Sequence, residues 1–293
     1  MITIIWTSLI ALGIWFLIIL IIDLKKHKNS LENSSWIKTF MIGFVVDFFD
    51  TLGIGAFAPQ TALLKFTKQT EDRIMPGTLN VSNTIPALIE GIIFIKIIEV
   101  DPLTLVLMLL SATAGGVIGA GIVAKLPERK VRIAIAIALL VTAFFMVANN
   151  LKWIQGGGHE IGLSGGKLII ALIVNCILGA LNTAGIGLFA PCMALVFALG
   201  MSPQVAFPIM MGSCAFLMPL ASAKFIKEGA YNRKASISMT IAGSIAVIIA
   251  AFIVKSLTLD VLRWVVIGVI IYTSVVMLKA AFSQKQKRQM QIE

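Results

Sequence analysis

The sequence predicts an all-α polytopic membrane protein with seven full spans and two broken, re-entrant helical hairpins, arranged as two inverted-topology repeats after an extra N-terminal span. Three observations support this fold class. Hydrophobic residues make up 58% and charged residues 13% of the 293 positions, against about 45–50% and 25% in soluble domains. Apolar stretches of about 20 residues, enough to cross a bilayer, recur along the chain. A glycine- and proline-containing motif occurs twice, 132 positions apart.

The first apolar segment, residues 2–22, has no basic residue before it and is followed by Lys25, Lys26 and Lys28. A secretory signal would have its charge in front and a small-residue cleavage site behind. We therefore expect a retained span with its N-terminus outside. Together with a cytoplasmic loop, it forms the first unit of the chain, residues 1–36.

Two repeats follow, and each begins with a motif-containing stretch that precedes three spans. The predicted units are repeat 1 at 37–150, a glycine-rich linker at 151–166, repeat 2 at 167–282 and a cytoplasmic tail at 283–293. The motif stretches are 37–66 and 167–199, and the spans are 76–98, 103–123, 131–150, 204–224, 236–254 and 260–282.

The repeated motif is DTLGIGAFAPQTALL at 50–64 and NTAGIGLFAPCMALV at 182–196, and Pro76 and Pro208 continue the same register. Shared hydrophobicity alone could produce a chance likeness. However, Gly-Ile-Gly, Phe-Ala-Pro and a downstream proline in a single register favour duplication. Paired interruptions in corresponding halves of a membrane protein indicate the substrate site of a transporter.

The distribution of positive charge distinguishes a crossing from a re-entrant hairpin. If each motif stretch crosses the membrane, 15 Lys and Arg residues lie inside and 9 outside. If each is a hairpin, 19 lie inside and 5 outside, which the positive-inside rule favours. A helix over 37–50 would also be only about 21 Å long, too short to span. Hairpins give each repeat an odd number of crossings, so the second repeat enters from the opposite face and the C-terminus is cytoplasmic.

Backbone breaks inside a membrane are tolerated only where they face protein or a wet cavity, so two converging breaks predict a cavity between the hairpin tips. Pro59 and Pro191 suit the first turn of the helix after each break. Free N–H groups and the positive dipole end at such a helix start favour an anion. The glycines at the tips are Gly53, Gly55, Gly185 and Gly187. They allow close approach of a ligand or, alternatively, only close helix packing.

Polar side chains near the tips are able to hydrogen-bond an oxyanion. In addition to the four glycines, the predicted substrate-binding residues are Thr51, Gln60, Asn83, Asn182, Thr183 and Ser213. Serine and threonine often bond to carbonyls of their own helix, so we expect only some of these residues to line the pathway.

Asp47 and Asp50 are the most specific single residues, because an ionisable group in a membrane segment is costly and indicates function. They are spaced i, i+3 on one helix face and would repel an anion when ionised, which predicts a proton that binds with the substrate. Asp50 could instead cap the second hairpin arm, and its counterpart Asn182 favours capping. Asp47, whose counterpart is Gly179, is the better proton candidate. Glu90 is another, or else the partner of a buried donor.

Several function classes receive no support from the sequence. Basic residues form short clusters between apolar segments, so they indicate topology and not nucleic-acid binding. There is no P-loop, no nucleophile–base spacing of a known kind, and no metal or cofactor motif, and Cys176, Cys192 and Cys214 are expected to be buried free thiols. An anion channel and a membrane-embedded enzyme or assembly factor remain the alternatives to a transporter.

The two motifs, together with LGMSPQVAFPIMMGSCAFLMP at 199–219, resemble the sulfite exporter TauE/SafE family, also called the toluene-sulfonate uptake permease group, over residues 37–282. The resemblance implies a bacterial inner-membrane secondary transporter for small anions such as sulfite, sulfonates or sulfoacetate-type compounds. It also implies that transport is driven by the proton gradient. Alternating access is the mechanism that the inverted repeats favour, and the expected partners are the anion, protons and the lipid bilayer.

This chain departs from the commoner family pattern, in which the tip glycines are followed by further glycines. Ala56, Phe57, Leu188 and Phe189 stand there instead, so we expect a narrower tip and a substrate that differs accordingly. The extra first span lies outside the usual core of the family and suggests a role in topology or in the contacts of a homodimer.

Overall fold

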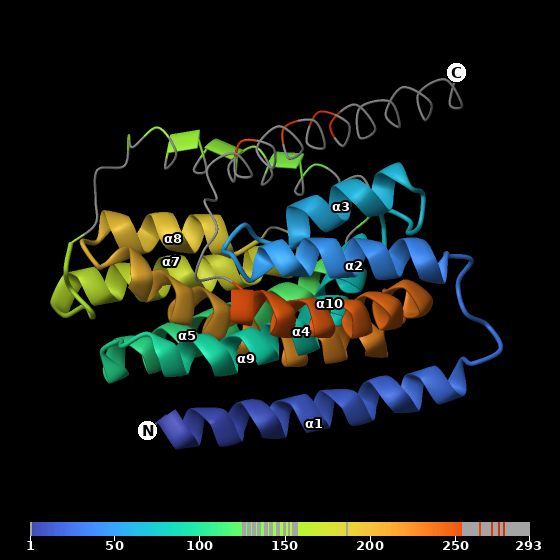
Figure 1. The fold of residues 1–293 in the computed structure, drawn as a ribbon, viewed down its shortest axis with the longest axis horizontal. Coiled ribbons are helices and arrows are strands. Elements are labelled where there is room, and N and C mark those ends of the chain that lie inside the picture. The colour runs from blue at the N-terminus through green and yellow to red at the C-terminus, as the bar shows by residue number, and fades with distance from the viewer. Residues whose placement is uncertain are drawn as a thin grey trace.

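The computed structural model describes residues 2–124, 158–185 and 187–253 continuously, with isolated positions between 127 and 153 and at 264, 271, 275 and 278. The described residues form a helical bundle without named strands (Figure 1). The predicted spans 131–150 and 260–282, most of the linker before residue 158 and the tail 283–293 lie outside the described residues or contain only isolated described positions.

The chain begins with α1 (Ile2–Lys26), a long apolar helix that lies along one side of the bundle. It ends with Lys25 and Lys26 in its last turn, where positive charge suits the helix dipole. Ser35 caps the next helix, α2 (Trp36–Asp50), because its side chain accepts a hydrogen bond from the Lys38 amide. The predicted first span and the start of the first motif stretch are therefore both helical.

The first motif stretch is broken as its glycines predict. After α2, a turn of six residues leads into α3 (Phe57–Phe66), and Pro59 lies in the first turn of α3. Two long helices follow, α4 (Met75–Ile97) and α5 (Pro102–Val123). Asp101 caps α5 through a 2.8 Å hydrogen bond from the Thr104 amide, and this bonding holds the pKa of Asp101 below its ordinary value.

The second half repeats this order of elements. Its helices are α7 (Gly165–Asn182), α8 (Phe189–Ala198), α9 (Ala206–Lys227) and α10 (Arg233–Ile253). Helices α3 and α8 have the same bounds at the 132-residue offset, and α2 and α7 end at the equivalent positions Asp50 and Asn182. The helix α7 starts at Gly165, two residues before the predicted start of the second motif stretch.

Each pair of packed helices has a counterpart when every helix is replaced by the equivalent helix of the other half. Helix α2 packs on α10 and α7 packs on α5, while α4 and α9 pack on each other in the centre. Small residues allow these approaches. A β-carbon at Gly43 of α2 would lie 2.7 Å from the Met239 Cα of α10, and one at Gly115 of α5 would lie 1.8 Å from the Cys176 carbonyl oxygen of α7.

Six of the described helices are long and apolar enough to cross a membrane: α1, α4, α5, α7, α9 and α10. Helix α2 has 15 residues and α3 and α8 have 10 each, so none of these three reaches across about 30 Å of hydrocarbon. Helix α7, with 18 residues, is about 27 Å long. In Figure 1 the α2–α3 pair lies toward one end of the bundle and the α7–α8 pair toward the other.

Candidate functional site at the two hairpin tips

The two breaks have the same backbone geometry. Gly53 and Gly55 in the first tip have φ values of 85° and 93°, and Gly185 in the second has a φ of 92°. These values lie in the left-handed region, where a side chain costs about 1–2 kcal/mol. The glycines therefore provide the reversal that ends one short helix and starts the next.

The two tips pack against each other reciprocally. A β-carbon at Gly55 would lie 3.8 Å from the Cβ of Phe189, and one at Gly187 would lie 3.9 Å from the Cβ of Phe57. Each of these is ordinary van der Waals contact between the last glycine of one motif and the phenylalanine of the other. The predicted convergence of the tips is therefore present in the structure.

A small cavity lies between the tips, bounded on its far side by α4 and α9. Its volume is about 20 Å³, room for roughly one water molecule. The residues that line it are Asp50, Gly55, Ala56, Phe57, Asn83, Ala87, Asn182, Gly187, Leu188, Phe189, Cys214 and Met218. Both tips contribute equivalent positions, since Asp50, Gly55 and Phe57 correspond to Asn182, Gly187 and Phe189.

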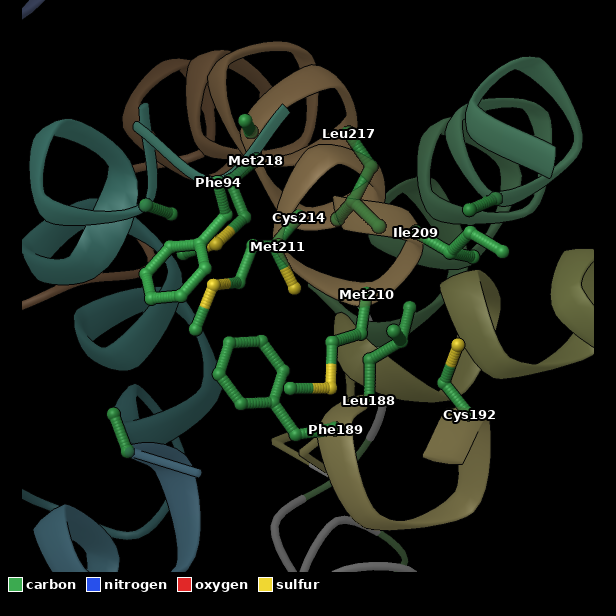
Figure 2. Close-up of a cluster of buried hydrophobic side chains, with 14 of the residues drawn as sticks. Phe94, Leu188, Phe189, Cys192, Ile209, Met210, Met211, Cys214, Leu217 and Met218 are labelled. Carbon is green, nitrogen blue, oxygen red and sulfur yellow. The ribbon is translucent and has the colours of Figure 1, made fainter. Parts of the chain in front are cut away.

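One wall next to the cavity consists of apolar and sulfur-containing side chains. Figure 2 shows Met210, Met211 and Cys214 of α9 beside Phe189 of α8. Phe94 from α4 stacks on Phe207 with ring centroids 5.6 Å apart. Thioether and thiol groups adapt to irregular surroundings. This wall is therefore polarisable and offers few hydrogen bonds to a ligand.

A polar network lies behind the first tip. The Gln60 side-chain amide donates to Asp47 Oδ1 at 2.8 Å and to Asn83 Oδ1 at 3.0 Å, and Asn83 Nδ2 donates back to Gln60 Oε1 at 2.6 Å. The carboxylate of Asp47 lies against α10, where a β-carbon at Gly243 would be 1.7 Å from Asp47 Oδ2. Asn83 lines the cavity, so this network connects the cavity to Asp47.

Glu90 belongs to the same side of the site. Thr51, the first residue after α2, donates to Glu90 Oε1 at 2.9 Å and to the Asp47 carbonyl at 2.9 Å. Glu90 and Asp47 are both completely buried. Thr51 therefore connects Glu90 to the helix end that carries Asp47 and Asp50.

The three carboxyl groups near the first tip are not neutralised by basic side chains within the described residues. No Lys or Arg in the described part of the chain forms an ion pair with Asp47, Asp50 or Glu90. One oxygen of each, Asp47 Oδ2, Asp50 Oδ1 and Glu90 Oε2, is buried without a hydrogen-bond partner. Buried charge is costly unless it is paired, so this cluster is unsuited to three simultaneous negative charges.

The equivalent residues Asp50 and Asn182 differ in what they offer to the cavity. The backbone amides of Gly55 and Ala56, just before α3 begins, lie close to the Asp50 carboxyl group. These are the donors that an anion would need at that tip. Asn182 is 1% exposed, lines the cavity, and its Nδ2 has no hydrogen-bond partner. The second tip therefore has an unused donor where the first has a carboxylate.

Residues 3–146 match the family model described as Sulfite exporter TauE/SafE. The match covers just under half of the 293 residues. It includes α1, which we had placed outside the usual core, and it ends before the second motif. No curated protein and no solved structure matches this chain.

The TauE/SafE family is a family of membrane transporters for sulfite and other anions, and the described helices agree with a multi-pass membrane protein. Within this framework, the structure places the residues that we predicted for the site in two groups. Five of them line the cavity: Asp50, Gly55, Asn83, Asn182 and Gly187. The residues Asp47, Thr51, Gln60 and Glu90 form the network just described.

The remaining predicted residues have contacts away from the cavity. Gly53 faces α9, because a β-carbon added to Gly53 would lie 3.0 Å from the Phe207 ring. Thr183 donates to the Ala180 carbonyl at 2.7 Å, and Gly185 lies in the turn after α7. Ser213 is not among the lining residues. It accepts a 3.3 Å hydrogen bond from Asn175 Nδ2, which also donates to the Met108 carbonyl.

Some lining residues were not predicted. Phe57 and Phe189 entered the sequence analysis only as departures from the family pattern, and Cys214 only as a buried thiol. The signal for Phe57 and Phe189 was their position, because the second residue after each tip glycine pair lies next to the opposite tip once the tips converge. Met218 gave no signal, since a methionine in an apolar helix fits an ordinary core equally well.

Proposed function

We propose that this protein is a proton-coupled secondary transporter that holds a small anion between the two hairpin tips and exposes it alternately to each side of the membrane. The observation that carries the proposal is the difference between Asp50 and Asn182 at equivalent places around one small cavity. A carboxylate at one tip and an unpartnered amide at the other suit a site that binds a proton and an anion together.

The anion is expected at the second tip. Helix α8 begins at Phe189, and the first N–H groups of a helix have no partner within it. Asn182 Nδ2 adds a further unpaired donor. Donors that gather at the positive end of a helix dipole favour a negative ligand. At the first tip the equivalent donors lie close to the Asp50 carboxyl group.

Protons are expected at the first tip. An anion in the cavity would be close to Asp50, and Glu90 and Asp47 interact electrostatically with Asp50. Ionised carboxylates would repel the anion, whereas protonated ones would not. Binding of the anion therefore favours binding of a proton, and this linkage couples the two fluxes.

Alternating access follows from inverted repeats, because two nearly equivalent packings are able to exchange roles. Support comes from the helix pairing, which is unchanged by exchange of the halves, and from the opposite placement of the two hairpins in Figure 1. Phe57 and Phe189, one from each hairpin, both line the cavity and would have to separate for a substrate to enter. Opening on either side requires one hairpin to move away from the other.

The substrate is expected to be sulfite or a small sulfonate or sulfoacetate-type anion. The family description names sulfite. The cavity, with a volume of about 20 Å³, would have to widen to admit even a compact anion. The sulfur-containing side chains beside the cavity, such as Cys214 and Met218, add a polarisable surface that suits a sulfur oxyanion.

The proposal is tested by uptake of sulfite into proteoliposomes with and without an imposed proton gradient. The variant Asp47→Asn is expected to lose most of the proton-dependent uptake, while sulfite still protects the purified protein against thermal unfolding. Asp72→Asn is the matched control, because Asp72 is a buried carboxylate paired with Lys65 in the turn between α3 and α4. Unchanged pH dependence of uptake in Asp47→Asn would remove Asp47 from the mechanism.

A further inference from the structure

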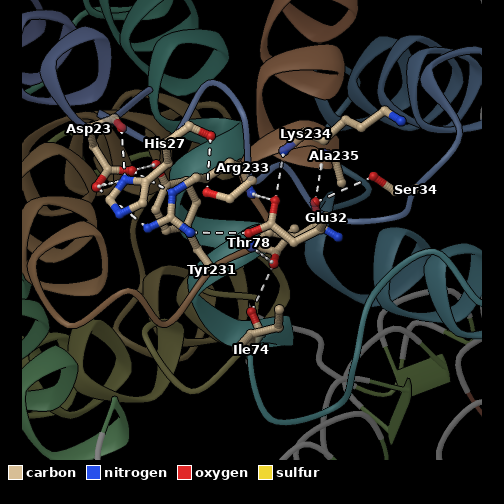
Figure 3. A network of polar contacts seen from close by, with 12 residues as sticks. Asp23, His27, Glu32, Ser34, Ile74, Thr78, Tyr231, Arg233, Lys234 and Ala235 are labelled. Carbon is tan, nitrogen blue, oxygen red and sulfur yellow. Dashed lines mark hydrogen bonds and ion pairs between the residues drawn. The ribbon is translucent and has the colours of Figure 1, made fainter. Parts of the chain in front are cut away.

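A large groove lies far from the hairpin tips, at the end of the bundle where α1 ends and α10 begins. Its volume is about 890 Å³, and it runs between α1 and the last two turns of α9. Figure 3 shows the polar network at its rim, where Asp23 and His27 of the α1 region meet Tyr231 and Arg233. The predicted topology places this end of the bundle at the cytoplasmic membrane surface.

One side of the groove is apolar. Trp15, Ile19 and Ile22 of α1 face Leu220 and Ile226 of α9 across it. Trp15 is 40% exposed and Ile22 is 62% exposed in the described chain. Because α1 is a membrane helix by length and composition, this wall lies at the depth of the lipid chains and would accommodate an acyl chain.

The other side of the groove is basic. Lys26, Lys224 and Lys227 all line it, with Glu228 as an acidic neighbour. The Lys224 ammonium group donates to the Val117 carbonyl of α5, a neutral partner that leaves its charge unbalanced. No ion pair is found for these three lysines within the described part of the chain.

The remaining acid of the groove is already neutralised. Asp23 accepts hydrogen bonds from Arg233 Nε and from the Tyr231 hydroxyl, both at 2.7 Å. Burial and the bond to Asp23 raise the pKa of Tyr231 above its ordinary value, so Tyr231 remains a neutral donor. Arg233 also binds Glu32 at 3.2 Å. The lysines therefore leave the groove with a net positive charge.

We propose that this groove binds an anionic phospholipid, with its phosphate between Lys224 and Lys227 and an acyl chain along Trp15, Ile19 and Ile22. Basic pockets between membrane helices at this face suit anionic headgroups. A free phosphate ion would use the lysines and leave the apolar wall unoccupied, so a lipid fits both halves of the groove. The bound lipid would fill the space between α1 and α9 and fix α1 on the bundle.

Native mass spectrometry of the full chain, titrated separately with phosphatidylglycerol and phosphatidylcholine, tests this proposal. The wild-type protein is expected to retain phosphatidylglycerol more tightly. Neutralising one lysine near a membrane surface weakens the binding of an anionic lipid by about fivefold. The double variant Lys224→Gln, Lys227→Gln should therefore bind phosphatidylglycerol roughly 25-fold more weakly than the wild type. Lys227→Gln alone serves if the double variant does not fold, since Lys227 makes no hydrogen bond or ion pair within the described residues.

The matched control is Lys167→Gln at the other end of the bundle, where Lys167 also donates to a backbone carbonyl, that of Leu199. This variant should bind phosphatidylglycerol as the wild type does. Glycerol 3-phosphate, a headgroup without chains, should not displace the lipid. Equal retention of both lipids by the wild type, unchanged binding in the lysine variants, or displacement by glycerol 3-phosphate would overturn the assignment. None of these results bears on anion transport at the hairpin tips.

Discussion

The two hairpin tips have the same backbone and different chemistry. Each has a glycine with φ near 90°, and each packs its last glycine against the phenylalanine of the other. However, the first tip has the carboxyl group of Asp50 close to its own amides, whereas the second has Asn182 with an unpartnered donor. The common shape is what a duplication would produce, and we propose that this difference of one residue separates a proton site from an anion site.

The two halves also differ one helical turn before the tips. Asp47 of α2 lies against Gly243 of α10, while its counterpart Gly179 of α7 lies against Ala112 of α5. At each interface a glycine allows close approach, but only the first interface encloses a carboxylate. The second interface therefore offers packing alone, whereas the first also contains an ionisable group.

The largest effect is expected from Asn182→Asp, which makes the second tip like the first. The new carboxylate would occupy the start of α8 and repel the anion. Loss of a hydrogen bond to a charged ligand costs about 1.5–3 kcal/mol, and repulsion adds to this, so sulfite binding should fall about 100-fold or more. Isothermal titration calorimetry on the folded variant measures this fall, and binding within a few-fold of wild type would refute the comparison.

The reverse change, Asp50→Asn, makes the first tip like the second. Proton-driven accumulation of anion should be abolished, because the carboxyl group that faces the cavity no longer titrates. Downhill flux should change by less than about tenfold, since a neutral hydrogen bond contributes about 1 kcal/mol. Uptake measured with and without a pH gradient separates these two quantities. If Asp50→Asn still accumulates the anion against its gradient, Asp50 is a structural cap alone.

A smaller effect distinguishes the two interfaces behind the tips. Gly243→Ala places a methyl group on the Asp47 carboxylate, and Gly179→Ala places one 2.1 Å from the Ala112 carbonyl oxygen. Both should lower stability by about 1–3 kcal/mol, the usual cost of overpacking. Only Gly243→Ala should also shift the pH dependence of transport. Equal pH profiles in the two variants would show that Asp47 has no role beyond packing.

The smallest effect is expected at Asp101, which stabilises the start of α5 away from both tips. Asp101→Ala should cost about 1 kcal/mol through loss of the cap without changing anion binding. Because the folded-state pKa of Asp101 is depressed, its ionic contribution is present above the unfolded pKa of about 3.9 and is lost as the pH falls through the lower folded value. The melting temperature of Asp101→Asn should therefore fall less steeply with decreasing pH below about pH 4 than that of the wild type. The same dependence of melting temperature on pH in both proteins would contradict this.

The broken helices and the convergence of the tips could be predicted from the sequence because Gly-Ile-Gly and Phe-Ala-Pro occur in both halves in a single register. Gly55, Pro59 and their counterparts required a break in each half, and the duplication required the breaks to be equivalent. Helix ends at Asp50 and Asn182 followed from the same motif.

The orientation of individual side chains could not be predicted in the same way. On α9, Cys214 and Met218 are spaced i, i+4 and line the cavity, so Ser213 points about 100° away from Cys214. An apolar helix that is buried on all sides gives no periodicity from which to choose this rotation. The position of the Asp50 carboxyl group close to the first-tip amides was likewise only one of two interpretations that the sequence allows.

The most direct test of the account is the position of a bound anion. Selenite, a heavier analogue of sulfite, can be located by anomalous scattering in crystals of the protein. The account predicts a selenium peak in the cavity within hydrogen-bonding distance of Asn182 and the start of α8. A peak at the start of α3 beside Gly55 and Ala56, or one outside the cavity, would contradict it.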